Sequence, residues 1–276
     1  ALGEALDIRQ GTPFCTPCAI YAGSYADAAE SNIVIVTCGI ARKPGQTRLD
    51  LTQTNVNILK SVIPEITKYA PNAYYIIVSN PVDILTYTFN RRSGVPESNI
   101  IGSGTILDTA RLRSRIAEFY NINQKNVHAY VMGEHGDSSF IPWSLANISN
   151  VPVADYSRFV SGPNMERTQL DFDEIETYVH KSGARVIERK GATFYAVSVS
   201  VCHICRCLLS NLGSTLTVST MMHGEYGIDD VCLSVLNMVG SGGLLGKVLP
   251  PLTDDEAARL RHSADCLKDV IRSIDI

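Results

Sequence analysis

The chain has 276 residues, of which 45% are hydrophobic and 19% charged, and its formal net charge at pH 7 is −4. This charge provides no broad cationic surface, so nucleic acid is not an expected partner. No apolar run reaches the ~20 residues that span a bilayer, and no basic segment followed by an apolar stretch opens the chain. We therefore expect a cytoplasmic globular protein with room for two packed lobes and no membrane association.

The first hundred residues alternate between helical and extended patterns. We expect a helix over residues 1–11, a buried β-branched strand over 31–39, and an amphipathic helix over 51–70 with a kink at Pro64. An apolar strand over 73–81 ends at Asn-Pro, a helix over 82–94 stops at Gly94, and a short strand covers 99–104. This alternation predicts a parallel sheet whose carboxyl edge holds ligands.

The pattern changes after Thr105. A helix is expected over 107–122, followed by a strand-like stretch and a polar loop within 126–144. Residues 168–209 are helical for most of their length, with interruptions near Gly183 and Gly191, and 214–249 predict short strands with Gly-rich turns. A last helix over 253–274 has Thr253 as its N-cap. The second part is therefore expected to be an α+β lobe.

Eight cysteines raise the question of a metal site. Cys15 and Cys18 form a C-x-x-C pair, and Cys202, Cys205 and Cys207 cluster later, which are spacings found in zinc sites. The second cluster, however, lies in a continuous apolar stretch with helical character, where cysteines act as small buried hydrophobes. Its three positions also cannot share one face of a helix. We therefore expect no metal site and no disulfide framework.

Three short segments carry the candidate chemistry. His135, in "MGEHGDSS", can exchange a proton near neutral pH if a carboxylate such as Asp108 orients it, although the sequence alone does not bring the two together. Asp108 and Arg111 share a helix face, either as a weak surface ion pair or with Arg111 binding a carboxylate through its planar guanidinium. Asn80, in "SNPVD", is either a turn residue or a hydrogen-bond partner of a substrate or cofactor.

Together these segments resemble the lactate/malate dehydrogenase family, and its bacterial lactate branch most of all. The matching stretches include "GEALDIRQG", "TCGIARKPGQTRLDL", "SNPVDILTY", "IGSGTILDTARLR", "NVHAYVMGEHGDS" and "KGATFYA", in the order of the family. The resemblance implies an α/β fold, with an incomplete Rossmann-type parallel sheet in residues 1–102, a remnant of the NAD-binding domain. An α+β catalytic domain would then occupy residues 103–276.

The resemblance also implies an enzyme that interconverts (S)-lactate and pyruvate by hydride transfer with NAD. His135 would be the acid/base, oriented by Asp108, while Arg111 binds the substrate carboxylate. Arg48 would lie on a loop that closes over the substrate and polarises the carbonyl. Asn80 and Thr193 would line the substrate pocket. The implied cofactor-binding residues are Tyr25, Gly39, Ile40, Val78, Ser79, Asn80 and Ser103.

Family membership further implies a homotetramer of fermentative metabolism, regulated by a sugar bisphosphate such as fructose 1,6-bisphosphate. Its binding residues would be Arg113 and His128, since a guanidinium and an imidazole suit phosphate. The alternative is that both are ordinary surface residues.

The sequence departs from the family in two places. The family's first strand and its G-x-G-x-x-G turn are absent, so we expect the chain as given to bind NAD poorly, or to survive as a catalytically silent subunit. Arg42 stands where lactate dehydrogenases carry Gln and malate dehydrogenases carry Arg. A buried Arg facing the methyl group of pyruvate would be unpaired, whereas it would pair with the second carboxylate of oxaloacetate. Breadth of match favours lactate, and malate stays the alternative.

Overall fold

A six-stranded sheet lies at the centre of the computed structural model, which describes residues 1–40, 48–162 and 168–276. Strands β1 (Ile33–Val36), β2 (Tyr74–Ile77) and β3 (Ile100–Gly102) are parallel, as the sequence predicted. Strands β7 (Ser214–His223), β8 (Asp229–Gly240) and β9 (Gly243–Lys247) continue the same sheet in antiparallel fashion, because β7 pairs with β3. The strands expected in the second lobe thus extend the first sheet.

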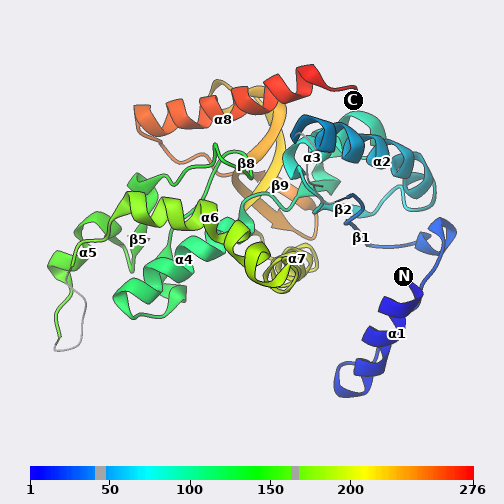
Figure 1. Cartoon of the computed structure of the whole chain (residues 1–276), viewed down its shortest axis with the longest axis horizontal. Coiled ribbons are helices and arrows are strands. Elements are labelled where there is room, and N and C mark those ends of the chain that lie inside the picture. Colours follow the sequence, from blue (N-terminus) through cyan, green and yellow to red (C-terminus); the bar gives the residue numbers. More distant parts are fainter. Residues whose placement is uncertain (41–47, 163–167) are drawn as a thin grey trace.

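Helices cover both faces of this sheet (Figure 1). Alternate residues of β2 point to opposite faces: Tyr75 and Ile77 join one core with α2, α3, β8 and α8, whereas Ile76 joins another with α7, β7 and the end of β8. The helices are α1 (Leu2–Gly11), α2 (Arg48–Tyr69), α3 (Val82–Ser93), α4 (Ile106–Tyr120), α5 (Val153–Phe159), α6 (Phe172–Lys190), α7 (Tyr195–Leu208) and α8 (Asp254–Ser273).

A separate core lies where α4 packs against α6 and a small antiparallel sheet. Leu112 and Ile116 of α4 and Val179 of α6 are buried there. The small sheet consists of β4 (Val127–His128), β5 (Asn147–Ile148) and β6 (Val151–Pro152). The sequence did not predict β5, β6 or α5, because strands of two residues carry too little periodicity to be recognised.

Three predictions about individual segments were wrong. The strand expected to be buried, β1, is the edge strand of the sheet, and Ile35 is 45% exposed. Gly183 does not interrupt the helix: α6 runs through it and ends at Gly191, whose φ is +84°. Cys202, expected among buried cysteines, is exposed, although Cys207 in the same helix is buried.

The helix ends follow local sequence signals. Thr253 caps α8, and its hydroxyl accepts a hydrogen bond from the backbone N–H of Glu256 while the Glu256 carboxylate accepts one from the N–H of Thr253. Gly94 ends α3 in the left-handed conformation, as expected. Among the described helices, none combines the length and the apolar character needed to cross a membrane.

Candidate active site

The loop that carries His135 is held by three different elements. The backbone N–H of Gly133 donates to the carbonyl of Ser234 in β8, and that of Glu134 donates to the hydroxyl of Ser263 in α8 over 2.7 Å. A Cβ on Gly133, whose φ is +93°, would lie 2.6 Å from that hydroxyl, so only glycine fits here. The N–H of His135 donates to Oδ2 of Asp83 in α3 over 2.7 Å. The loop backbone is therefore positioned before any ligand binds.

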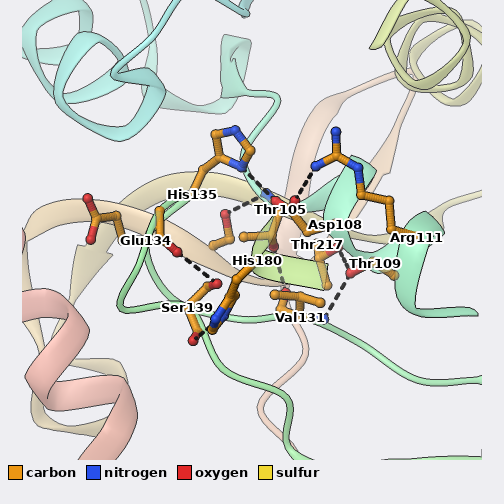
Figure 2. Close-up of polar contacts among 12 residues, drawn as sticks. Thr105, Asp108, Thr109, Arg111, Val131, Glu134, His135, Ser139, His180 and Thr217 are labelled. Atoms are coloured by element: carbon orange, nitrogen blue, oxygen red, sulfur yellow. Dashed lines mark hydrogen bonds and ion pairs between the residues drawn. The ribbon is translucent and has the colours of Figure 1, made fainter. Parts of the chain in front are cut away.

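The start of α4 is held just as firmly. The Thr105 hydroxyl donates to the carbonyl of Val131 over 2.6 Å, and the Val131 N–H donates to the Thr109 hydroxyl over 2.9 Å. The Thr109 hydroxyl also bonds that of Thr217 in β7. Figure 2 shows these contacts beneath Asp108. They fix the first turn of α4, from which Asp108 projects.

Asp108 joins the acid/base candidate to the candidate carboxylate binder (Figure 2). Its Oδ2 lies 2.6 Å from Nδ1 of His135, and its Oδ1 accepts a hydrogen bond from Nη1 of Arg111 over 2.8 Å. The side chain of Asp108 is 10% exposed, that of Arg111 18% and that of His135 28%. The sequence did not establish this proximity, and the fold brings the three side chains together.

The charges of this trio reinforce one another. Burial alone would raise the pKa of Asp108, but the His135 and Arg111 cations and their hydrogen bonds bring it below its usual value. For His135, burial lowers the pKa, whereas Asp108, and then Asp83, raise it above the usual value. The imidazolium form of His135 is therefore favoured beside an ionised Asp108, as a proton donor requires.

These side chains open into a cavity of about 320 Å³ at the carboxyl edge of β2 and β3. This is the edge at which open α/β sheets bind ligands. Seven of the residues that the sequence analysis singled out line the cavity: Val78, Asn80, Ser103, Asp108, Arg111, His135 and Thr193. Helices α6 and α7 also contribute residues to the lining of the cavity, and Thr193 lies in the segment between them.

Other predicted residues lie elsewhere or outside the described part of the chain. Arg42 is among the residues that the structure does not describe, and Arg48 begins α2 with an undescribed side chain. Of the expected cofactor residues, four do not line the cavity: Tyr25, Gly39, Ile40 and Ser79. Gly39 and Ile40 follow β1, and the Ile40 N–H donates to the Asn55 side chain over 2.8 Å, while another Asn55 hydrogen bond reaches the carbonyl of Asn80. This places both segments at the same sheet edge.

The two residues expected to bind a bisphosphate lie away from the cavity. Arg113 is half-buried on α4, and His128 is exposed on β4, which packs against α4. The prediction that they bind a bisphosphate is not tested by the structure.

Sequence reasoning missed several residues at the site. His180 and Gly183 of α6 line the cavity, and Nε2 of His180 lies 3.1 Å from the carbonyl of Ser139. A histidine in an amphipathic helix carries no signal of this position. Asp83 lies within the quoted segment "SNPVD", yet only the fold shows that it contacts the His135 loop.

The cysteines form no metal site in the part of the chain that the structure describes. No group of three or more possible metal ligands is found there, and all eight cysteines are free thiols. This finding agrees with the different burial of Cys202, Cys205 and Cys207 along α7.

Comparisons with known proteins agree with the fold. Residues 1–102 match the model of the lactate/malate dehydrogenase NAD binding domain, and residues 105–275 match that of the α/β C-terminal domain. The chain is 43% identical over 279 residues to L-lactate dehydrogenase of Thermoanaerobacterium saccharolyticum, covering 100% of this chain and 88% of the relative. It is 45% identical to L-lactate dehydrogenase 1 of Clostridium acetobutylicum, covering 99% and 87%.

Solved structures show the same similarity. The minor L-lactate dehydrogenase of Enterococcus mundtii superimposes with a TM-score of 0.93 at 33% identity, covering 100% of this chain and 87% of that one. The L-lactate dehydrogenase of Clostridium thermocellum gives a TM-score of 0.88 at 38% identity, covering 100% and 88%. Family models that together span nearly the whole chain, and relatives above 40% identity, establish the conclusion: this chain belongs to the lactate/malate dehydrogenase family.

Proposed function

We propose that the protein is an NAD-dependent L-lactate dehydrogenase that interconverts (S)-lactate and pyruvate. The observation that carries the proposal is the trio of His135, Asp108 and Arg111 at one cavity, with both oxygens of Asp108 engaged. In this proposal residues 1–102 bind the cofactor, and residues 103–276 supply the substrate and catalytic groups. The relatives named lactate dehydrogenase support the same substrate.

His135 would exchange the proton of the reaction. Because Nδ1 is engaged by Asp108, Nε2 is the ring nitrogen that would donate a proton to the keto oxygen of pyruvate and accept it from the hydroxyl of lactate. Asp108 would stabilise the imidazolium and hold the ring orientation without itself becoming protonated. The raised pKa of His135 agrees with its role as proton donor near neutral pH.

Arg111 would hold the substrate carboxylate. Asp108 occupies one of its terminal nitrogens, and the guanidinium keeps further N–H groups that face the cavity. A carboxylate bound by this planar fork would place C2 of the substrate near His135. Arg48 would polarise the carbonyl from a closing loop, and Asn80 and Thr193 would complete the pocket.

The cavity also fits a nicotinamide ring. Its wall beside Asn80 is apolar, with Val78, Ile106 and Val197, so a flat ring could pack there while Asn80 bonds its amide. Bound NAD supplies the hydride acceptor, and NADH the hydride, for C2 of the substrate. Val78, Asn80 and Ser103 would hold the ring; Tyr25, Gly39, Ile40 and Ser79 would contact the rest of the cofactor.

The test is the oxidation of NADH by pyruvate, followed at 340 nm. We expect His135→Asn to lower kcat by ~10²–10⁴-fold, because general acid catalysis contributes about that much. His223→Asn is the matched control: His223 is exposed at the end of β7, outside the cavity, and its variant should keep the wild-type rate. A His135→Asn variant as fast as the wild type would exclude the proposed mechanism.

Malate dehydrogenase activity is the second candidate, because Arg42 would pair with the second carboxylate of oxaloacetate. Comparing kcat/KM for pyruvate and oxaloacetate decides between them. A strong preference for oxaloacetate that Arg42→Gln reverses would replace lactate by malate as the substrate. NADH titration of the protein separates both enzymes from a catalytically silent subunit, which would not bind the cofactor.

Assembly, regulation and location belong to the same proposal. Tyr195 and Val199 on the outer face of α7 are 74% and 67% exposed, and Leu209, which follows the helix, is 70% exposed. This favours burial in a homo-oligomer, with a tetramer as the proposed state. Fructose 1,6-bisphosphate is the proposed effector, bound by Arg113 and His128, and the cytoplasm is the proposed location. Sedimentation velocity with and without the bisphosphate tests assembly and regulation together.

A further inference from the structure

A second carboxyl group is buried behind the His135 loop, and the mechanism above does not use it. Asp83 is the second residue of α3 and is 2% exposed. Its Oδ2 accepts the hydrogen bond from the backbone N–H of His135. Carboxylates are rarely buried in this way without an ion pair, because desolvation disfavours the charged form. The contact with the proposed acid/base residue suggests why this one is present.

The surroundings of Asp83 leave its charge only partly compensated. Oδ1 of Asp83 and the hydroxyl oxygen of Ser219 in β7 are both buried, and neither makes a hydrogen bond of normal geometry within the described part of the chain. Burial raises the pKa of Asp83 to about 6, although the Ser219 hydroxyl, the His135 amide and the His135 charge each act to lower it. The pKa of Asp83 is therefore raised by burial, while contacts with the His135 loop favour its charged form.

Two further ionisable groups interact with Asp83 besides His135 in the described part of the chain. Glu134, in the His135 loop, raises the pKa of Asp83, and the thiol of Cys232 in β8 is close enough for Asp83 to raise its pKa in turn. Asp83 forms no ion pair with a Lys or Arg among the described residues, and His135 is the cation among the main causes of its pKa shift. The charge that balances an ionised Asp83 is thus the His135 imidazolium, and Asp83 in turn favours that form.

We propose that Asp83 is a positioning residue for the reaction: it fixes the backbone of His135 and places a second buried negative charge behind the imidazole, which helps to hold the proton that the ring delivers. The inference rests on the proposed function of His135. Asp108 hydrogen-bonds both the His135 ring and the Arg111 guanidinium. Asp83, in contrast, contacts only the backbone of His135 and acts on the ring through its charge. Asp108 thus orients the ring and supports its charge directly, and Asp83 adds a second, weaker support for the same charge.

Asp83→Asn tests the charge alone. The amide oxygen can accept the His135 N–H, and the amide nitrogen can donate to the Ser219 hydroxyl, so the variant keeps the shape and the contacts of the site. We expect the His135 imidazole pKa, measured by NMR titration with the signal assigned through His135→Asn, to fall by about 0.5–1 unit. The pH above which pyruvate reduction is lost should fall equally, with little change in the KM for pyruvate, because Arg111 is untouched.

Two further variants separate this role from a structural one. Glu256→Gln neutralises another buried carboxylate, which accepts hydrogen bonds from Ser144 and caps α8; it should lower the melting temperature but leave the His135 pKa unchanged. Ser219→Ala removes a group that favours ionised Asp83, so it should lower the His135 pKa in the same direction as Asp83→Asn, by less.

The NMR titration needs no turnover, so it decides on Asp83 even if the protein does not reduce pyruvate, and an inactive wild type would count against the proposed function alone. If Asp83→Asn and Ser219→Ala both leave the His135 pKa at the wild-type value, or if Asp83→Asn merely lowers the melting temperature as Glu256→Gln does, Asp83 has no such role.

Discussion

At the scale of single residues, the site depends on carboxyl groups in unlike environments. Asp108 is buried between two cations, which keep its pKa low, whereas Asp83 is buried with no ion pair to a Lys or Arg in the described part of the chain, and its pKa is raised to about 6. Because the pKa of Asp108 is lowered, Asp108 stabilises the folded protein at pH values above 3.8, its usual pKa. This contribution is lost as the pH falls through the folded pKa. The raised pKa of Asp83 acts in reverse: its contribution is greatest below pH 3.8 and is lost as the pH rises through 6.

His135 sets the upper end of the pH range in which its ion pair with Asp108 stabilises the fold. Because its pKa is raised in the folded protein, its contribution to stability is fully present below 6.5, its usual value, and is lost as the pH rises through the folded value. The ion pair with Asp108 therefore stabilises the fold most between about pH 4 and pH 6.5, using the usual values of the two groups.

We predict that Asp108→Asn lowers the free energy of unfolding by about 1–3 kcal/mol near pH 6, because a hydrogen bond between charged, largely buried groups is lost. The difference from the wild type should become smaller as the pH rises through the pKa of His135, because the ion pair then loses its cation. Urea titrations at pH 6 and pH 9 measure it. A difference that stays constant or grows with pH would show that the two side chains do not form the ion pair.

At the scale of elements, two glycines of α6 differ although the sequence pattern treats them alike. Gly183 lies in the helix interior, and an added Cβ would be 3.8 Å from the Arg111 guanidinium, an ordinary contact. Gly191 ends the helix at φ +84°, a conformation that side chains with a Cβ rarely adopt. One position tolerates a side chain, and the other requires glycine.

Gly183→Ala should therefore stabilise the protein by about 0.5–1 kcal/mol, because alanine loses less backbone freedom in a helix. Gly191→Ala should destabilise it, by about 1 kcal/mol or more, through strain at the helix end. Thermal unfolding of the two variants, followed by circular dichroism, compares them directly. Equal shifts in the same direction would mean that the two positions do not differ as described.

At the scale of the whole molecule, one sheet unites the two parts that the family models match separately. The pairing of β3 with β7 makes the sheet continuous, and the core formed by α2, α3 and α8 extends from β2 to β8. Trp143, in contrast, packs against the separate core that α4 forms with α6 and the small sheet. If the cores depend on each other through the shared sheet, they should unfold together.

Leu233→Ala tests this coupling. Leu233 is fully buried in β8, so the cavity should lower the free energy of unfolding by about 2–5 kcal/mol. We expect the same shift of the urea midpoint in Trp143 fluorescence as in circular dichroism. Leu2→Ala, on α1 at a position that is 79% exposed, is the matched control and should shift neither. A fluorescence midpoint that does not move in Leu233→Ala would show that the cores unfold separately.

The sequence alone predicted the features that depend on neighbouring residues. The three parallel strands, the helices between them, and the stops at Gly94 and Gly191 follow from periodicity and from glycine, while the Thr253 cap follows from a side chain that reaches its own helix end. The candidate trio was also named in advance, since residue chemistry and family motifs are properties of the sequence.

Only the tertiary structure decided which of these residues meet. His135 and Asp108 are 27 residues apart, and Asp83 reaches the His135 loop from another helix. Such contacts depend on the path of the backbone and on the packing of several elements, which no local pattern records. The same holds for the joining of β7 to β3, because the choice of neighbouring strand depends on the whole fold and not on the composition of the strand.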